Sequence, residues 1–357
     1  MPKSTLESEQ RISDVQLDVP LADLTTLRVG GPARRLIAVS SEPDLIDCVR
    51  DLDARAEPVL IMGGGSNLLI ADTGFDGTVV KIETRGVKED VSACSGAVLS
   101  VAAGENWDGL VVRTLEEEFV GLEAMSGIPG LVGATPMQNV GAYGGEVSYS
   151  IEMVRTYDRQ NQEIRTFAAA ECGFSYRSSR FKVETGRYVI LSVSFQLRLG
   201  SMSGPIRYLE LARALGVELN GRAPATAVRE GVLDLRRAKG MVLDGDDRDT
   251  WSAGSFFTNP ILDVQQSAAL PADAPRFPQA DGRVKTSAAW LIERAGFGKG
   301  FGDGAARVST KHSLALTNRG AATAADLLNL ARLIQTGVRA RFGLTLVPEP
   351  DLVGCEL

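Results

Sequence analysis

A serine between a glycine and two aromatic residues is the first candidate for chemistry in this chain. Ser255 lies in "WSAGSFFTNP", where Phe256 and Phe257 should keep its hydroxyl in a packed, partly dry place. A nucleophilic serine needs an adjacent base, usually histidine. The sequence has one histidine, His312, and Ser255 lacks the G-x-S-x-G surroundings of a nucleophile elbow. Taken alone, the pattern favours a serine in a tight turn.

A glycine-rich stretch at residues 62–68, "MGGGSNL", could surround an anionic oxygen of a cofactor. Consecutive glycines allow backbone N–H groups to approach and enclose such an oxygen. The stretch has neither the G-K-[ST] of a P-loop nor the helix that follows a Rossmann turn. It therefore predicts a strand, a loop and a second strand, and a glycine-rich hairpin without a ligand remains an alternative.

A second glycine-rich stretch, "SGIPGLVGATPMQNVGAYGGE", covers residues 126–146 with six glycines and two prolines. Long irregular segments in compact domains are usually functional or disordered, and this one is too apolar for disorder. A flat cofactor that lies against backbone, with amide side chains at its edges, would need such a segment. Together the two stretches favour a large cofactor that carries phosphate.

The composition limits the class of protein. A net charge of −7 argues against nucleic acid as a partner, although a local basic cluster could still bind a small anion. The polar N-terminus does not resemble a signal peptide, and no apolar run reaches membrane-spanning length. Without a C-x-x-C spacing, the cysteines predict buried, reduced thiols of a cytoplasmic protein and no metal site. They are Cys48, Cys94, Cys172 and Cys355.

The elements that must position these residues form a mixed α+β pattern rather than an even β-α alternation. Residues 34–40, 41–55 and 58–63 predict a β-α-β unit. Alternating patterns predict strands at 77–83, 97–104, 152–158, 163–169 and 188–197. Helical patterns occupy 106–118, 207–216, 225–240, 287–296 and 324–343. The last helix should bury Leu327, Leu330, Leu333 (or Ile334) and Val338, and should end at Gly343.

In order and spacing, several motifs resemble those of the UDP-N-acetylenolpyruvoylglucosamine reductases. The motifs are TTLRVGGPA, IMGGGSNLL, AAGENW, GLEAMSGIPGLVGATPMQNVGAYG, YRSSRFK, SAGSFFTNP and VSTKHSLALTN. The resemblance runs from about residue 25 to residue 354, and RYLEL resembles the segment that carries a substrate-facing tyrosine in one subclass. It implies an NADPH-dependent FAD enzyme that reduces UDP-N-acetylglucosamine enolpyruvate in peptidoglycan precursor synthesis.

The resemblance also implies an α+β architecture, with a two-subdomain FAD-binding fold of the vanillyl-alcohol oxidase (PCMH) type and a C-terminal α+β substrate domain. We therefore expect a mobile tail over residues 1–20, FAD-binding subdomain 1 over 21–89 and subdomain 2 over 90–245. The substrate domain should cover 246–344, and residues 345–357 could pack back on subdomain 1. The sequence points to no obligate protein partner.

By motif match, the first glycine-rich stretch should contact the FAD pyrophosphate and the second the flavin ring. Enzymes of this fold that bind flavin covalently do so through histidine or cysteine, and neither residue lies in these stretches, so we expect noncovalent FAD. The expected cofactor contacts are Met62, Gly63, Gly64, Gly65, Ser66, Asn67, Leu68, Ser126, Gly127, Ile128, Pro129, Gly133, Gln138, Asn139, Gly141, Ala142, Tyr143 and Gly144.

The family's catalytic positions match Arg177, Ser255 and Glu349. When hydride reaches C3 of the enolpyruvyl group, negative charge develops at C2 and spreads into the carboxylate. Arg177 could pair with that carboxylate and Glu349 could hydrogen-bond the developing enol. Ser255 could protonate C2 without a histidine, because a carbanion is a far stronger base than a hydroxyl. In the family an apolar residue and an arginine usually follow the glutamate, whereas Pro350 and Asp351 follow here.

The substrate carries a pyrophosphate and a carboxylate, so an acidic protein must supply positive charge locally. By motif match, Lys239 should reach the pyrophosphate, although the spacer between Lys239 and Ser255 is longer than in the family. Solvated helix faces remain an alternative for the basic residues, and His312 is interpreted as structural. The expected substrate contacts are Tyr176, Tyr208, Lys239, Asn259 and Lys285.

Two other functions remain open at this point. A different FAD oxidoreductase of the same fold would keep the glycine-rich stretches but would not need Arg177, Ser255 and Glu349 together. A UDP-sugar binder that has lost catalysis is the second alternative, and Pro350 beside Glu349 is the feature that favours it.

Overall fold

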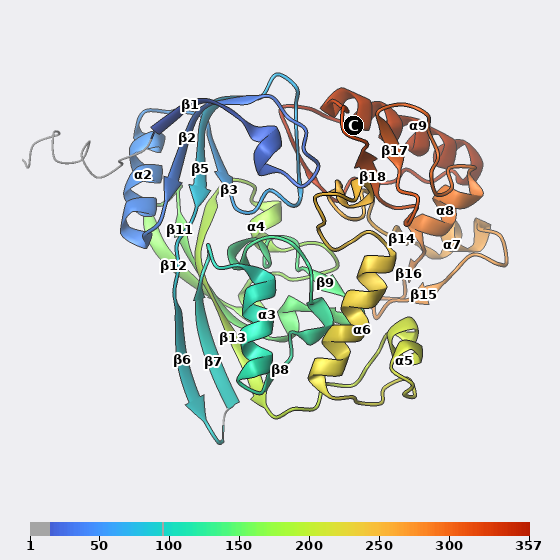
Figure 1. Ribbon diagram of the computed structural model, residues 1–357, viewed down its shortest axis with the longest axis horizontal. Helices are drawn as coiled ribbons and strands as arrows, with labels where there is room; N and C mark the ends of the chain where they lie inside the picture. The colour runs from blue at the N-terminus through green and yellow to red at the C-terminus, as the bar shows by residue number, and fades with distance from the viewer. Residues whose placement is uncertain (1–14, 95) are drawn as a thin grey trace, which may run out of the picture. The chain divides into compact units, whose positions relative to one another are not determined.

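The computed structural model describes residues 15–94 and 96–357, which form two compact units (Figure 1). The first unit contains, of the described residues, 15–19, 33–64 and 76–237. The second unit contains Pro20–Pro32, Gly65–Phe75 and Ala238–Leu357. The chain therefore passes between the units several times, and neither unit is a continuous segment.

The first unit contains the β-α-β unit expected from the sequence. Strand β2 (Pro32–Val39), helix α2 (Glu42–Ala54) and strand β3 (Val59–Met62) follow one another, and β5 (Phe75–Ile82) lies between β2 and β3 in the sheet. Strands β3 and β5 are parallel. Helix α2 begins where Ser41 Oγ accepts the Asp44 N–H, at 3.3 Å, as expected of an N-cap serine.

The expected N-terminal tail is only partly described. Residues 1–14 lie outside the described residues, but Val15–Pro20 form strand β1, which pairs with β2 at the edge of the sheet. This part of the prediction was wrong. The alternating sequence VQLDVP is typical of a strand. Its side chains are mostly exposed, as is usual on a strand at a sheet edge.

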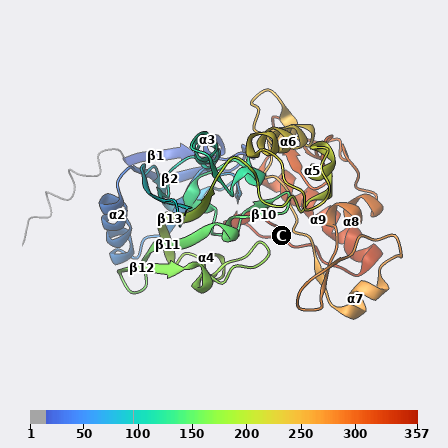
Figure 2. The ribbon, with the colours of Figure 1, turned by 90° about the horizontal axis from the view of Figure 1, so that it is seen from below.

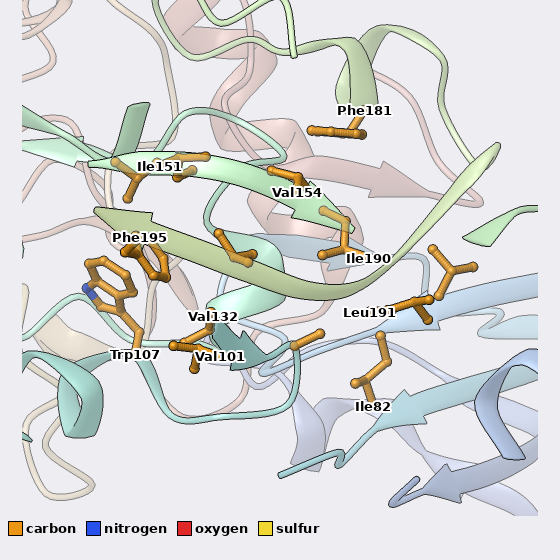
Figure 3. Close-up of a cluster of buried hydrophobic side chains, with 14 of the residues drawn as sticks. Ile82, Val101, Trp107, Val132, Ile151, Val154, Phe181, Ile190, Leu191 and Phe195 are labelled. Carbon is orange, nitrogen blue, oxygen red and sulfur yellow. The ribbon is translucent and has the colours of Figure 1, made fainter. Parts of the chain in front are cut away.

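A six-stranded antiparallel sheet forms the rest of the framework of the first unit. Its order is β12-β11-β13-β7-β6, with β8 paired to the end of β13. Figure 3 shows its core, where Trp107 at the start of helix α3 (Trp107–Glu116) packs against Phe195 with ring centroids 6.0 Å apart. The strands are β6 (Val87–Ser92), β7 (Gly96–Ala102), β8 (Phe119–Val120), β11 (Ile151–Asp158), β12 (Glu163–Ala168) and β13 (Tyr188–Leu199).

The second glycine-rich stretch is ordered but has little regular structure. The turns η2 (Glu123–Met125), η3 (Val132–Ala134) and η4 (Val147–Tyr149) border or interrupt it, and β9 (Gly141–Ala142) pairs with β10 (Gly145–Glu146). Helix α4 (Arg180–Val183) and turn η5 (Ala169–Glu171) lie further along the chain. Helices α5 (Leu209–Ala214) and α6 (Ala225–Ala238) pack side by side through a small apolar cluster that includes Leu211 and Val232 (Figure 2).

The second unit has small sheets and three helices among its described residues. Strand β4 (Leu68–Ile70) pairs in parallel with β19 (Asp351–Val353), so the end of the chain returns to the segment after the first glycine-rich stretch. The other strands are β14 (Ile261–Leu262), β15 (Phe277–Pro278), β16 (Val284–Lys285), β17 (Ala306–Val308) and β18 (Leu316–Asn318). The helical elements are η1 (Leu21–Leu24), η6 (Arg248–Thr250), α7 (Val264–Ala269), α8 (Ala288–Arg294) and α9 (Ala324–Phe342).

Helix α9 has the buried face and the stop that the sequence predicts. Leu327, Leu330, Ile334 and Val338 are buried, and Gly343 ends the helix in the left-handed conformation, with φ 69°. The structure thus selects Ile334 over Leu333, which is 51% exposed.

The cysteine prediction needs one correction. Cys48 and Cys172 are buried, but Cys355 is only partly buried and Cys94 is exposed. Burial raises the pKa of the Cys48 thiol to about 11 and that of Cys172 to about 12, so both are protonated at neutral pH. Cys94 lies just beyond β6, where the strand ends in solvent. In the part of the chain that is described, no helix is long and apolar enough to span a membrane.

Candidate active site

The first glycine-rich stretch is a strand, a loop and a strand, as predicted, and its backbone approaches the second stretch closely. A Cβ added to Gly64 would lie 2.9 Å from Gly130 Cα, closer than real side chains come. A Cβ added to Gly63 would lie 3.6 Å from Leu131 Cδ1, an ordinary van der Waals contact. Glycine at position 64 therefore allows the two stretches to lie backbone against backbone within the first unit.

The start of helix α3 holds the 126–133 segment in place. Asn106 Oδ1 caps the helix by accepting the Gly109 N–H at 2.7 Å, and Trp107 is the next residue. The Trp107 backbone N–H donates to Gly130 O at 3.1 Å, and its indole N–H donates to Met125 O at 3.0 Å. Because Trp107 is buried in the core, the backbone on both sides of Gly127 is attached to a rigid element.

Asn139 ties the 138–146 segment to a neighbouring loop. Its side-chain Nδ2 donates to Glu146 Oε2 at 2.8 Å and to Ser175 O at 3.1 Å. Its Oδ1 accepts the Ser148 N–H at 3.2 Å. The amide of Asn139, which the sequence assigned to the cofactor, is thus used to hold the protein together, and it positions the turn that follows Ser175.

That turn carries Tyr176 and Arg177. Backbone hydrogen bonds in both directions join Ser175 and Ser178, so Tyr176 and Arg177 stand at its tip. Arg177 has φ 53°, in the left-handed region that non-glycine residues rarely adopt. Its Nη2 donates to Gly141 O at 2.8 Å, and its guanidinium lies 5.4 Å from the Tyr176 ring. The arginine head group is therefore aimed at the β9–β10 hairpin.

Three non-glycine residues in this part of the first unit have a positive φ, as do six others elsewhere among the described residues. Asn139, Tyr143 and Arg177 have φ values of 45°, 49° and 53°. Each such residue costs on the order of 1–3 kcal/mol, and strain of this kind gathers at functional sites. Asn139, Tyr143 and Arg177 all lie in the region that the motifs singled out.

Two tyrosines meet above the β9–β10 hairpin. The rings of Tyr143 and Tyr208 are 5.4 Å apart and nearly perpendicular, so the segment before α5 lies next to the hairpin. Burial raises the pKa of Tyr143 to about 12, although Arg236 opposes the shift. Burial also lowers the pKa of Arg236 to about 10. Arg236 was not predicted as a site residue, although its position four residues after buried Val232 on α6 indicates that it turns inward.

In the second unit the structure brings Ser255 and Glu349 together. The Glu349 N–H donates to Phe256 O at 2.9 Å, one residue after the serine, and Phe257 bridges to Pro348. Phe256 and Phe257 are buried, so the partly buried serine stands beside an apolar core, as the sequence predicted.

Asn67 of the first glycine-rich stretch holds Glu349 from the other side. Its Nδ2 donates to Glu349 O at 3.3 Å, and its carbonyl accepts the Asp351 N–H at 2.9 Å. Pro350, which replaces the family's apolar residue, is buried between these bonds. The proline leaves both neighbours' hydrogen bonds in place, because Asp351 rather than residue 350 supplies the N–H that begins the β4–β19 pairing.

The remaining expected substrate residues divide between the units. Tyr176 and Tyr208 belong to the first unit, and Lys239, Asn259 and Lys285 to the second. Asn259 Oδ1 accepts the Ala288 N–H at 2.9 Å at the start of α8, close to Lys285 on β16. Lys239 directly follows α6.

His312 takes part in the turn that supports the serine loop. Its carbonyl accepts the Ala315 N–H at 3.1 Å, and the carbonyl of Leu314 in the same turn accepts the Phe256 N–H at 2.7 Å. These backbone contacts agree with a structural role for this segment.

Two family matches cover most of the chain. Residues 33–166 match an FAD binding domain, and residues 246–353 match the C-terminal domain of UDP-N-acetylenolpyruvoylglucosamine reductase. The α+β FAD-binding fold and the separate C-terminal domain expected from the sequence are thereby confirmed.

Curated relatives match over nearly the whole chain. The UDP-N-acetylenolpyruvoylglucosamine reductase of Cutibacterium acnes is 57% identical over 95% of this chain and 90% of its own length. The reductase of Streptomyces coelicolor is 54% identical over 100% of this chain and 94% of its own. The crystal structure of the Thermus caldophilus reductase superposes with a TM-score of 0.65 at 25% identity, and it covers 95% of this chain and 98% of its own.

Proposed function

Since the chain belongs to the UDP-N-acetylenolpyruvoylglucosamine reductase family, we propose that it uses NADPH to reduce UDP-N-acetylglucosamine enolpyruvate to UDP-N-acetylmuramate. It is an FAD-dependent oxidoreductase of peptidoglycan precursor synthesis. The observation that supports this reaction most directly is the adjacency of Glu349 to Ser255: the Glu349 N–H donates to the carbonyl of Phe256, the residue after the serine. A cytoplasmic location, where NADPH is available, is part of the proposal.

The glycines of the first unit that belong to the two glycine-rich stretches fit FAD. Gly64 and Gly130 leave no room for a Cβ between them, and such a bare backbone surface suits a cofactor that must approach peptide groups. Residues 62–68 would hold the pyrophosphate, while residues 126–133 and 138–144 would hold the ring. Bound FAD supplies the hydride that the reaction consumes. We keep residues 21–245 as the FAD-binding part and 246–344 as the substrate-binding part of this proposal.

Arg177 is the residue we assign to the substrate carboxylate. Its guanidinium is held by Gly141 O and lies beside the Tyr176 ring, so the head group is oriented before substrate arrives. A preoriented guanidinium stabilises negative charge that spreads from C2 into the carboxylate. Removing one such donor costs on the order of 10²–10³ in rate in comparable sites.

Ser255 is the residue we assign to protonation of C2. Its hydroxyl is neutral, but transfer to a carbanion is downhill, so no histidine is needed to activate it. Glu349 would hydrogen-bond the developing enol, and its backbone is fixed on both sides by Phe256 and Asn67. Tyr176, Tyr208, Lys239, Asn259 and Lys285 remain the proposed substrate contacts.

The visible spectrum of the anaerobic protein tests the proposal. Flavin bands should bleach on addition of NADPH and return on addition of UDP-N-acetylglucosamine enolpyruvate. Bands that bleach but do not return would indicate a different FAD oxidoreductase of this fold. A protein that takes up no FAD but binds the UDP-sugar would be a binder without catalysis.

A further inference from the structure

A carboxylate outside the expected site residues contacts the second glycine-rich stretch. Asp108, on the first turn of α3, accepts the Gly127 backbone N–H at 2.6 Å. The same carboxylate receives two hydrogen bonds from Arg229 on α6, at 2.6 Å and 2.8 Å. Asp108 thus links two helices to one peptide group of the segment that we assign to the flavin ring.

The backbone at this peptide can adopt two orientations. Ser126 has φ −58° and ψ 143°, and Gly127 has φ 71°, as at the two central positions of a type II turn. A type I turn differs mainly in the two angles that flank the central peptide, so a rotation of that peptide converts one turn into the other. Glycine at 127 permits both conformations.

Hydrogen bonds hold the residues on either side of this turn, so the orientation of the central peptide is the feature that remains to be fixed. Ser126 is buried, and its Oγ donates to Glu123 O at 2.8 Å. Met125 O accepts the Trp107 indole N–H, and Gly130 O accepts the Trp107 backbone N–H. The bond from Gly127 N–H to Asp108 is the contact that distinguishes the two orientations.

We propose that Asp108 is a positioning residue that fixes the peptide between Ser126 and Gly127 in one orientation. In a trans peptide the C=O points opposite to the N–H, so Asp108 also sets the direction of the Ser126 carbonyl. The effect on the flavin rests on the proposed function, because it requires the ring to lie against this segment.

The negative charge of the Asp108 carboxylate strengthens its hydrogen bond with the Gly127 N–H. Burial would raise the pKa of Asp108, but the hydrogen bonds from Arg229 and from the Gly127 N–H outweigh it, and the positive charge of Arg236 adds to them, so the pKa is lowered. The side chain is therefore ionised throughout the neutral range. A charged acceptor makes a stronger hydrogen bond than a neutral one.

Three variants separate this role from simple bracing of α3 against α6. Asp108→Leu removes both the acceptor for Gly127 and the ion pair. Arg229→Met removes the ion pair but keeps the carboxylate. Asp53→Leu is the matched control, because Asp53 pairs with Arg159 in another part of the first unit with similarly limited exposure. If Asp108→Leu does not fold, Asp108→Ala, which also lacks an acceptor for Gly127, replaces it.

The first measurement needs no cofactor. Amide hydrogen exchange of 15N-glycine-labelled, FAD-free protein should show Gly127 exchanging about tenfold faster or more in Asp108→Leu, since a hydrogen bond to a charged group is lost. Arg229→Met should change this rate less than threefold. Equal rates in wild type and Asp108→Leu, or equal acceleration in both variants, would overturn the proposal.

The second measurement is FAD binding, followed by the visible flavin spectrum. Asp108→Leu should raise the FAD dissociation constant about tenfold or more and shift the flavin bands, while Asp53→Leu and Arg229→Met should leave both near wild type. If Asp108→Leu matches its controls, the positioning role is wrong. If wild-type protein binds no FAD, the proposed function fails, and the exchange experiment still decides the role of Asp108.

Discussion

Alanine at position 64 should weaken FAD binding more than alanine at position 63. The two glycines are neighbours in one loop, but the space around them differs. A Cβ on Gly64 would lie 2.9 Å from Gly130 Cα, and a Cβ on Gly63 would lie 3.6 Å from Leu131 Cδ1. The second distance is ordinary contact with a flexible side chain, and the first is overlap with backbone.

The magnitude follows from how little Gly130 can move. Its carbonyl accepts the backbone N–H of Trp107, which is buried at the start of α3, so relief must come from separating the two stretches. Overpacking of this kind typically costs about 1–3 kcal/mol. If that cost falls on the FAD-bound state, the dissociation constant rises roughly 5- to 150-fold. Gly63→Ala should instead gain up to about 1 kcal/mol from a less flexible unfolded chain.

Titration of FAD-free protein with FAD, followed by flavin fluorescence, measures the affinity, and urea unfolding measures the stability of each variant. Comparison of the two variants controls for the general effect of adding a methyl group to this loop. FAD affinity within twofold of wild type for Gly64→Ala would refute the close backbone approach as the reason for glycine there. Equal weakening by both variants would point to the loop's flexibility instead.

Three further outcomes are expected. Ser255→Ala should leave flavin reduction by NADPH near normal and slow reoxidation by the enolpyruvyl substrate by orders of magnitude in stopped flow; equal rates in both half-reactions would remove the proton-donor role. Arg177→Lys should lose about 10²-fold or more in kcat, because it keeps the charge but loses the fork that bonds Gly141 O; near-normal turnover would contradict this. Burial would raise the pKa of Asp249, but hydrogen bonds from Thr310 and the charge of Arg319 outweigh this effect, so the pKa is lowered. The stabilisation that the Asp249 carboxylate gives the folded protein is therefore present above the unfolded pKa of 3.8. It is lost as the pH falls through the folded pKa. Urea midpoints between pH 6 and pH 3 should therefore fall less for Asp249→Asn than for wild type, and parallel curves would show that Asp249 does not titrate in this range.

Patterns within about twenty residues predicted the larger elements well. Helices α2 and α9 begin and end close to the expected residues, because their caps and apolar faces are local properties of the sequence. Short strands such as β4 and β19 were not recognised. Each has three residues, and they exist because they pair with one another across most of the chain.

Motifs in the sequence alone were enough to name the family, the cofactor and the residue types at the site, because those features are chemical and lie on short segments. Only the tertiary structure placed Asn67 against Glu349, Gly64 against Gly130, and Asp108 against Gly127. Asn67 and Glu349 are 282 positions apart, so no local pattern could link them. Contacts of this kind depend on how separate elements pack, and burial and hydrogen bonding summed over a whole unit decide that packing.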